Sequence, residues 1–181
     1  LLVADFKKEP FSFKGIFGTT EQVALIKQEL PVPVDEIAMD SVEQVFSMSL
    51  DSLAIPTAYD GMEMVKVGDV NQSLIAEWLL AYSKEALGLD HYDVDRIYSS
   101  PECFVLKVSG QPVSLCNFNA RLPEVVQVGP VWTPPQHRGC KYAQIIVAMN
   151  LERVRRLGVQ RAILFTGAHN GAAIRCYEAI G

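Results

Sequence analysis

The residues best suited to chemistry lie in one stretch, VVQVGPVWTPPQHRGCKYA (125–143), where an apolar run passes through two prolines into a basic turn. This turn contains His137, Arg138 and Lys141 and precedes a predicted helix. The first backbone N–H groups of a helix have no acceptor within it, and the helix dipole adds partial positive charge there. Main-chain donors and cations together can hold a diphosphate. The same pattern also fits a turn that only begins a helix.

Other nucleotide and metal motifs do not match this chain. The turn fits neither the G-x-x-x-x-G-K-[ST] pattern of a P-loop nor the G-x-G-x-x-G pattern of a dinucleotide fold. The four cysteines are isolated, without a C-x-x-C pair or a cluster of histidines, so we expect no metal site and no disulfide framework. Cysteines of this kind are typical of buried positions in a reducing compartment.

The charge is distributed unevenly along the chain. The 181 residues carry a net charge of −5, which argues against a nucleic-acid surface. Residues 1–100 contain 7 basic and 17 acidic side chains, whereas residues 101–181 contain 9 basic and 4 acidic ones. The C-terminal half is therefore where we expect an anionic ligand. The alternative is that basic residues such as Arg153, Arg155 and Arg156 share a solvated helix face.

The elements that must position this turn follow from periodicity. Alternating or continuous apolar runs predict strands, and apolar residues three or four apart predict helices. A helix begins near Asp69 and Gln72 and ends at Gly88, and Ser109–Gly110 predicts a hairpin turn. The predicted strands are 62–67, 103–108, 112–118, 124–132 and 159–165, and the predicted later helices are 141–157 and 172–180. Three meandering strands followed by a β-α-β crossover predict an α/β fold with a mixed sheet and helices on its faces.

The first sixty residues are less regular. A capping-box pattern, Thr19 with Gln22, predicts a helix over 19–30, and alternation predicts a strand over 45–53. Pro56 and Asp60–Gly61 mark the best boundary. We therefore expect an N-terminal helix–strand extension at 1–60 and a main domain at 61–181.

Two motifs resemble a known family. VWTPPQHRGCKYA (131–143) is similar to the acyl-CoA-binding signature of the GNAT superfamily of N-acetyltransferases, with Arg138 and Ala143 at its first and last positions. Lys141 departs from the middle position, where the family usually has glycine. HNGAAIRCYEAIG (169–181) resembles the second signature of the family through Asn170, Ala173, Tyr177 and Gly181. The resemblance covers about residues 62–181.

The resemblance implies a GNAT-like fold, with a largely antiparallel mixed sheet and helices on both faces, and acetyl-CoA as the co-substrate without a metal. It implies that two strands splay apart near Gly129–Pro130, where the freed backbone receives the pantetheine arm. An edge strand containing a proline is the alternative there. The implied cofactor-binding residues are Val128, Gly129, Val131, His137, Arg138, Gly139, Cys140, Lys141, Tyr142, Ala143, Asn170 and Ala173.

The resemblance also assigns the chemistry. Tyr177 would lie near the CoA sulfur and protonate the departing thiolate, unless its ring only packs against the sheet. No residue is singled out as the base that deprotonates the amine, and Glu77, Glu102 and Glu124 are candidates by type alone. Trp78 and Tyr82 either line an acceptor pocket or belong to the core.

We therefore expect a cytoplasmic N-acetyltransferase that moves an acetyl group from acetyl-CoA to an amine by direct attack in a ternary complex. The alternative is a non-catalytic CoA-binding or interaction module, suggested by Lys141 in the phosphate turn. No nucleic-acid or membrane partner is expected, and a homodimer is left open. Residues 1–60 resemble the end of the degenerate N-terminal domain of some larger family members.

Overall fold

The computed structural model describes residues 15–30, 32–37, 40–57, 61–167 and 170–181. The chain divides into two compact units, Leu1–Val42 and Glu43–Gly181. In the first unit, α2 (Thr20–Glu29) begins at the predicted capping box. There Thr19 Oγ1 accepts from the Gln22 backbone N–H, and the Gln22 side chain accepts from the Thr19 N–H, both at 3.3 Å. No described residue of this unit is buried, so local hydrogen bonds rather than a core support α2.

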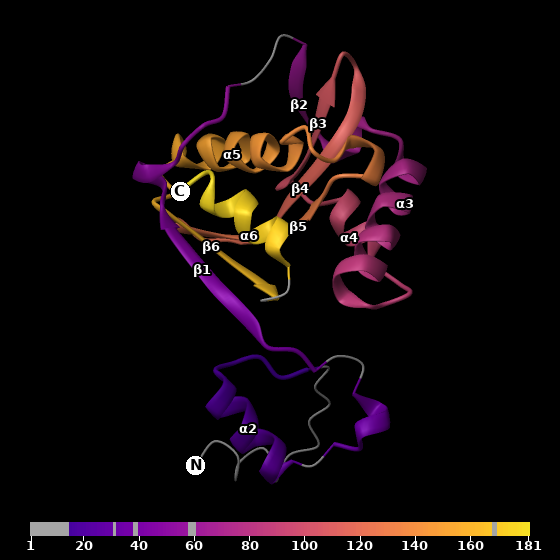
Figure 1. Ribbon diagram of the computed structural model, residues 1–181, viewed down its shortest axis with the longest axis vertical. Coiled ribbons are helices and arrows are strands. Elements are labelled where there is room, and N and C mark those ends of the chain that lie inside the picture. The colour runs from indigo at the N-terminus through magenta and orange to yellow at the C-terminus, as the bar shows by residue number, and fades with distance from the viewer. Residues whose placement is uncertain (1–14, 31, 38–39, 58–60, 168–169) are drawn as a thin grey trace. The chain divides into compact units, whose positions relative to one another are not determined.

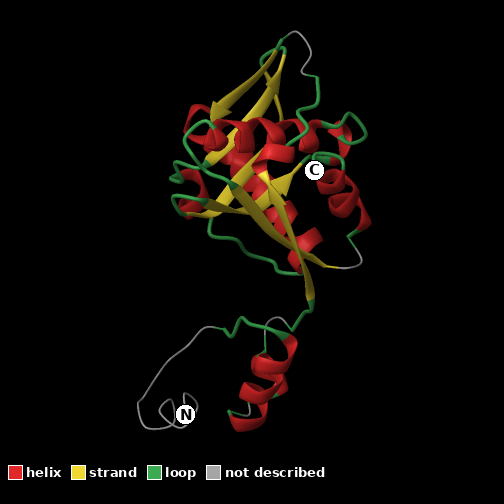
Figure 2. Cartoon of the chain, turned by 90° about the vertical axis from the view of Figure 1, so that its left-hand side faces the viewer, coloured by secondary structure: helices red, strands yellow, loops and turns green. Residues whose placement is uncertain are grey.

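The second unit is built on one six-stranded sheet. Its order is β1-β6-β5-β4-β3-β2, and only β5 and β6 run parallel. The strands are β1 (Glu43–Ser49), β2 (Met62–Lys66), β3 (Cys103–Val108), β4 (Gln111–Arg121), β5 (Val125–Trp132) and β6 (Arg161–Gly167). The sheet therefore has the predicted mixed, largely antiparallel topology, and Figure 2 shows it as one twisted layer between helices.

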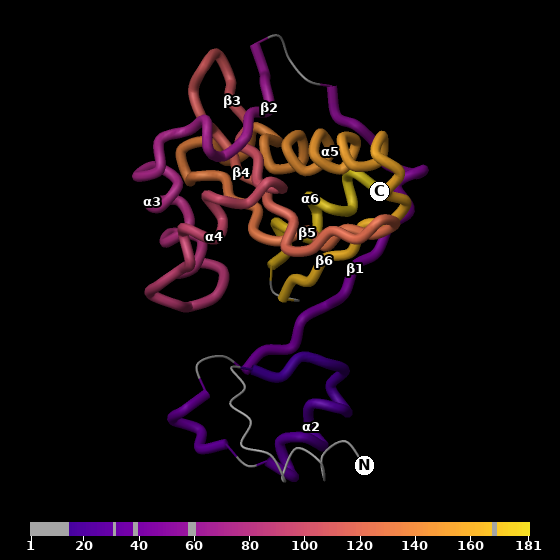
Figure 3. The backbone as a smooth tube through the Cα atoms, turned by 180° about the vertical axis from the view of Figure 1, so that it is seen from behind, coloured from indigo at the N-terminus to yellow at the C-terminus, as the bar shows by residue number. Residues whose placement is uncertain are grey.

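Helices cover both faces of this sheet (Figure 1). They are α3 (Gln72–Tyr82), continued by a π-helical turn at Ser83–Leu87, α4 (Val94–Tyr98), α5 (Tyr142–Arg155) and α6 (Gly171–Glu178). Ile146 and Leu151 of α5 pack in one apolar cluster with Ile180, which follows α6. Leu79 of α3 and Ile97 of α4 are buried in a second cluster. The arrangement can be followed from behind in Figure 3.

Several predicted boundaries differ from the structure. β1 pairs with β6, so the second unit begins at Glu43. The predicted boundary near Pro56 therefore lies inside this unit. Asp60, which was part of that prediction, lies outside the described residues. Sequence patterns missed this because strand pairing is not local. Asn71, rather than Asp69, caps α3, since its side chain accepts from two backbone N–H groups of the first turn. The short helix α4 was not predicted because five residues show no periodicity.

The feature of the fold that positions the site is a separation of two strands. β5 pairs with β6 only from Val125↔Arg161 to Val128↔Leu164, although both strands continue beyond these residues. At the same place the pairing of β4 with β5 is irregular. Between the pairs Cys116↔Val131 and Phe118↔Val128, β5 has two residues, Gly129 and Pro130. β4 has one residue there, Asn117. The predicted splay near Gly129–Pro130 is thus confirmed, because β5 and β6 separate after Val128. A β-bulge in β5, opposite β4, lies at the same two residues.

A buried polar network joins α5 to the sheet. The Glu102 carboxylate forms ion pairs with Arg153 and with Arg121, the latter at 2.9 Å. Asn150, which is fully buried, accepts from Arg153 Nε at 2.9 Å and donates to the Glu102 carbonyl. Partial burial favours the neutral form, but hydrogen bonds from Arg121 and Arg153 outweigh it and lower the pKa of Glu102.

This network predicts a specific acid sensitivity. Because the folded pKa of Glu102 is lowered, its contribution to the free energy of unfolding is complete above the unfolded value of about 4.3 and is lost as pH falls through the folded pKa. We expect Glu102→Gln to be less stable by roughly 1–3 kcal/mol at neutral pH and to lose less stability than the wild type on acidification. Urea unfolding across the acid range measures both. Parallel curves for the two proteins would contradict the assignment.

Candidate active site

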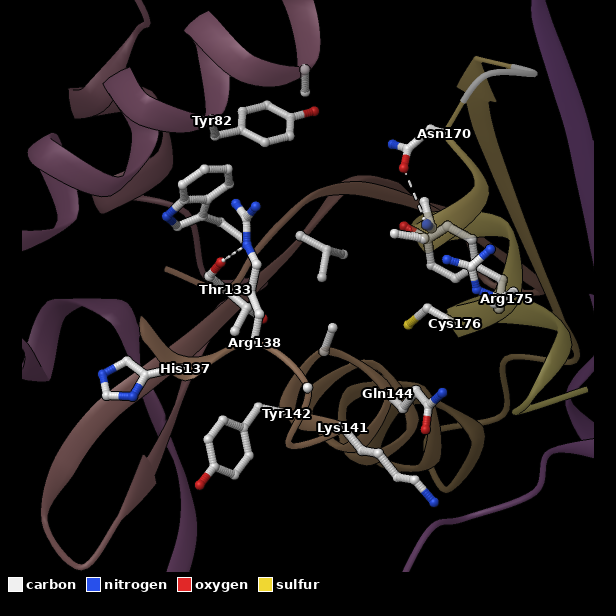
Figure 4. Close-up of a pocket in the computed structure, with 18 of the residues that line it drawn as sticks. Tyr82, Thr133, His137, Arg138, Lys141, Tyr142, Gln144, Asn170, Arg175 and Cys176 are labelled. Atoms are coloured by element: carbon white, nitrogen blue, oxygen red, sulfur yellow. Dashed lines mark hydrogen bonds between the residues drawn. The ribbon is translucent and has the colours of Figure 1, made fainter. Parts of the chain in front are cut away.

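A cavity of about 400 Å³ lies where the end of β5, the basic turn and the beginnings of α5 and α6 meet, and Figure 4 shows its lining. The lining joins residues that are distant in the sequence. It comprises Tyr82, Glu85, Ala86, Val131, Trp132, Thr133, His137, Arg138, Gly139, Lys141, Tyr142, Ala143, Gln144, Asn170, Ala172, Ala173, Arg175, Cys176 and Tyr177.

Most of the predicted site residues are brought together in this lining. Of the residues named from the resemblance, Val128, Gly129 and Cys140 are not part of it. Cys140 is exposed, and Val128 is buried at the last residue pair between β5 and β6. Gly129 lies in the bulge between β4 and β5, directly after the last residue of β5 that pairs with β6.

The basic turn ends in a helix start without a side-chain cap. Gly139 and Lys141 have φ values of 81° and 62°, in the left-handed region that favours glycine. The first hydrogen bond of α5 runs from Ile145 N to Lys141 O at 3.0 Å, so the N–H groups of Ala143 and Gln144 have no acceptor within the helix. These donors and the helix dipole make the turn suitable for an anion.

Arg138 departs from the expectation that its charge faces a diphosphate. Its Nε donates to the Thr133 carbonyl at 3.0 Å, and the guanidinium forms an ion pair with Glu85 at 2.9 Å and lies 4.9 Å from the Trp132 ring centroid. Glu85 follows α3, and no sequence pattern predicts that these distant residues meet. Lys141 lines the cavity and has no ion-pair partner among the described residues, so it is the free cation of the turn.

The bulge depends on a close fit between β4 and β5. A Cβ placed on Gly129 would lie 2.8 Å from Asn119 Nδ2 and even closer to other atoms of the same amide. Two hydrogen bonds in series hold the Asn119 amide in place. Asn117 Nδ2 donates to Asn119 Oδ1 at 3.5 Å, and Ser100 Oγ donates to Asn117 Oδ1 at 2.8 Å. Glycine is therefore needed at 129 for its size.

Asn170 begins α6 on the other side of the cavity. Its Oδ1 accepts from the Ala173 backbone N–H at 3.1 Å, which caps the helix (Figure 4). The cap leaves the Asn170 amide N–H₂ as the part of the side chain that can donate to a ligand.

Tyr177 and Cys176 line the same cavity from α6. Burial is the main cause that raises the pKa of the Tyr177 phenol, and it also raises the pKa of the Cys176 thiol to about 11. Both groups therefore stay protonated at neutral pH. Sequence reasoning missed Cys176, although it follows Ala173 by three residues and therefore lies on the same face of the helix as Ala173.

The acidic candidates do not gather at the cavity. Glu102 is held in its ion pairs, and Glu77 and Glu124 are exposed. None of these three candidates by type lies in the cavity lining. Trp78 is buried in the core, whereas Tyr82 lines the cavity. The one carboxylate in the described lining is Glu85, which sequence reasoning did not single out.

Within the described part of the chain, no three His, Cys, Asp or Glu side chains are placed to share a metal ion. None of its helices has both the length and the apolar character to cross a membrane.

Comparisons with known proteins identify relatives of this fold. The profile of the acetyltransferase (GNAT) family matches residues 70–181. No curated protein sequence was found to match.

Among solved structures, a GCN5-related N-acetyltransferase from Kribbella flavida superposes with a TM-score of 0.53 at 18% identity, over 74% of this chain and 52% of that one. One from Sphaerobacter thermophilus gives 0.55 at 18% identity, over 89% and 52%. A putative acetyltransferase from Salmonella typhimurium, determined with its cofactor acetyl-CoA, gives 0.51 at 16% identity, over 66% and 78%. This chain thus spans about half the length of the first two proteins, and the likeness establishes a GNAT fold.

The fit at the bulge can be tested by a double-mutant cycle. We expect Gly129→Ala to be less stable by about 1–3 kcal/mol, because its methyl group overlaps the Asn119 amide. Asn119→Ala should remove the overlap, so the double variant should recover most of that loss. Urea unfolding of the four proteins gives the coupling free energy. Additive effects would mean that another contact requires glycine at 129.

Proposed function

Because this chain belongs to the acetyltransferase (GNAT) family, we propose that it transfers an acetyl group from acetyl-CoA to an amine acceptor by direct attack in a ternary complex. The separation of β5 from β6 carries this proposal. Backbone N–H and C=O groups beyond Val128 have lost a neighbouring strand and need other partners. A pantetheine arm contains amides that can take the place of that strand.

The basic turn supports binding of the diphosphate of CoA. The N–H groups of Ala143 and Gln144 and the ammonium of Lys141 supply donors and positive charge at the cavity. Arg138 acts by holding the turn against Thr133 and Glu85 rather than by offering a free charge. Asn170 would donate its amide N–H₂ to the arm from the opposite side.

The transfer step needs a proton donor beside the sulfur. The amine nitrogen forms a bond to the thioester carbon, the C–S bond breaks, and the thiolate takes a proton. Tyr177 lines the cavity in its neutral form and would donate that proton. Burial raises both the pKa of the Tyr177 phenol and the pKa of a CoA thiol formed next to it. The difference between these two pKa values therefore governs the proton transfer.

The proton of the acceptor amine leaves by another route. Glu85 is the carboxylate of the described lining, and it already forms an ion pair with Arg138. We propose that the acceptor reacts after releasing its proton to solvent, so that turnover rises with pH as the amine becomes neutral. Acceptor identity is set by residues around Tyr82 and Glu85 at the α3 end of the cavity.

A non-catalytic CoA-binding module is the second candidate. Lys141 has a left-handed backbone at a position where the family usually has glycine, and a side chain there alters the space around the phosphates. For residues 1–60, of which 43–60 belong to the second unit, we retain the proposal of a remnant domain that does not bind CoA. For the chain we retain the proposal of a cytoplasmic location.

The binding step predicts a ligand-dependent stability. Acetyl-CoA at about 100 times its dissociation constant should add about 2.7 kcal/mol to the free energy of unfolding. Lys141→Glu should reduce this gain strongly, because it replaces the free cation of the turn, whereas Lys66→Glu on β2 is the matched control. Thermal unfolding with and without acetyl-CoA measures the shift. No shift in the folded wild type would remove the CoA site, and equal losses in both variants would mean that overall charge binds the ligand.

Tyr177 separates the enzyme from the binding module. Tyr177→Phe keeps the ring but removes the proton, so turnover should fall by about 10²–10⁴-fold while acetyl-CoA affinity persists. Tyr92→Phe, outside the cavity lining, is the control. Release of CoA thiol over a panel of amines gives the rate. Full turnover in Tyr177→Phe would exclude Tyr177 as the general acid. Tight CoA binding without turnover in the wild type would favour the non-catalytic CoA-binding module.

A further inference from the structure

Arg175 lines the candidate active site from α6, and the proposed function gives it no role. Its side chain is exposed and has neither an ion pair nor a hydrogen bond to the residues that the structure describes. The other cations of the lining differ in this respect, because Arg138 is paired with Glu85 and Lys141 belongs to the basic turn. Arg175 therefore offers a full positive charge to a ligand in the cavity.

The guanidinium of Arg175 lies against the first turn of α6. Arg175 follows Gly171 by four residues, so the two share a face of the helix, and side chains on a helix point toward its N-terminus. A Cβ placed on Gly171 would lie 3.2 Å from Arg175 Nη1. The helix dipole disfavours a cation at this end. Because no described carboxylate pairs with Arg175, an anion bound in the cavity would compensate its charge.

Two further donors accompany Arg175. Lys141 and Gln144, at the beginning of α5, lie on the same side of the cavity as Arg175, whereas Arg138 and Tyr82 lie on the other side (Figure 4). The carboxylate of the described lining, Glu85, is paired with Arg138 and so does not neutralise this side. The side of the cavity formed by α5 and α6 thus has two cations and one amide facing a ligand.

We propose that Arg175 binds the 3′-phosphate of CoA, with the side chains of Lys141 and Gln144 as additional donors. The inference rests on the proposed function, because CoA must occupy the cavity. It deepens that function by naming the class of acyl donor. Acyl groups carried on CoA would be preferred to acyl groups carried on a phosphopantetheine arm that lacks this phosphate, such as that of a carrier protein.

The chemistry of CoA favours this assignment. CoA has a diphosphate, for which the N–H groups at the beginning of α5 are proposed, and a phosphate monoester on its ribose. The same ribose joins both groups, so a site for the monoester must lie close to the diphosphate site. A phosphate monoester carries a charge of about −1.5 to −2 at pH 7. Arginine suits such a group, because its planar guanidinium donates two parallel hydrogen bonds to phosphate oxygens.

The test compares CoA with dephospho-CoA, which lacks only the 3′-phosphate. By calorimetry at low salt, we expect the wild type to bind CoA at least about tenfold more tightly than dephospho-CoA. Arg175→Gln should reduce this preference to about twofold or less and leave the affinity for dephospho-CoA within about twofold of the wild type. Arg161→Gln, at an exposed arginine of β6 outside the cavity lining, is the matched control and should keep the preference.

A charge reversal makes the test sharper. Arg175→Glu places a carboxylate beside the phosphate, so it should bind dephospho-CoA more tightly than CoA. The melting temperature of each unliganded variant shows that it is folded.

The outcomes separate this inference from the proposed function. Equal binding of CoA and dephospho-CoA by the wild type would overturn the inference and leave the proposed function intact. So would an equal loss of both affinities in Arg175→Gln, because that result would assign Arg175 to the diphosphate. Failure of both ligands to bind the folded wild type would overturn the inference and the proposed function together.

Discussion

The separation of β5 from β6 after Val128 and Leu164 is the constraint on which the rest of the site depends. Parallel strands that stayed paired would satisfy each other's backbone groups and close the space between α5 and α6. Because they part, backbone donors and acceptors of β5 are available beside two helix N-termini at the cavity of the candidate active site. The bulge at Gly129 and Pro130 lies where the separation begins, and the Asn119 amide occupies the space that a side chain at Gly129 would need.

The ion pairs around Glu102 and Glu85 differ in their burial and in what they hold in place. Glu102 with Arg121 and Arg153 forms a partly buried network that fastens α5 to the sheet, away from the cavity. Glu85 with Arg138 forms a more exposed pair that fixes the basic turn against the end of α3. Exposed pairs of this kind contribute little stability, so the significance of this pair is in holding the turn, where Lys141 has no ion-pair partner among the described residues.

Burial suits Tyr177 to its role in the proposed chemistry. It raises the pKa of the phenol, which stays neutral, as a proton donor must be. Cys176 beside it is also kept protonated by burial, which makes it a poor nucleophile and argues for direct attack over a covalent acyl-enzyme.

The sequence by itself determined the local elements and the motifs. Periodicity predicted the strands β2 to β6 and the helix α5. Glycines predicted the end of the helical segment at Gly88, after the π-helical turn that continues α3, and the turn of the β3–β4 hairpin at Gly110, and both glycines have positive φ. The two signatures predicted the family, which the match over residues 70–181 confirms. These features are short in range, so neighbouring residues are enough to encode them.

Only the tertiary structure decided which distant residues meet. It placed β1 beside β6, brought Glu85 to Arg138 and placed the Asn119 amide against Gly129. Each of these contacts joins residues that are far apart in the chain or lie on different strands. Their existence depends on register, bulges and packing volume, which a residue's neighbours in sequence do not specify.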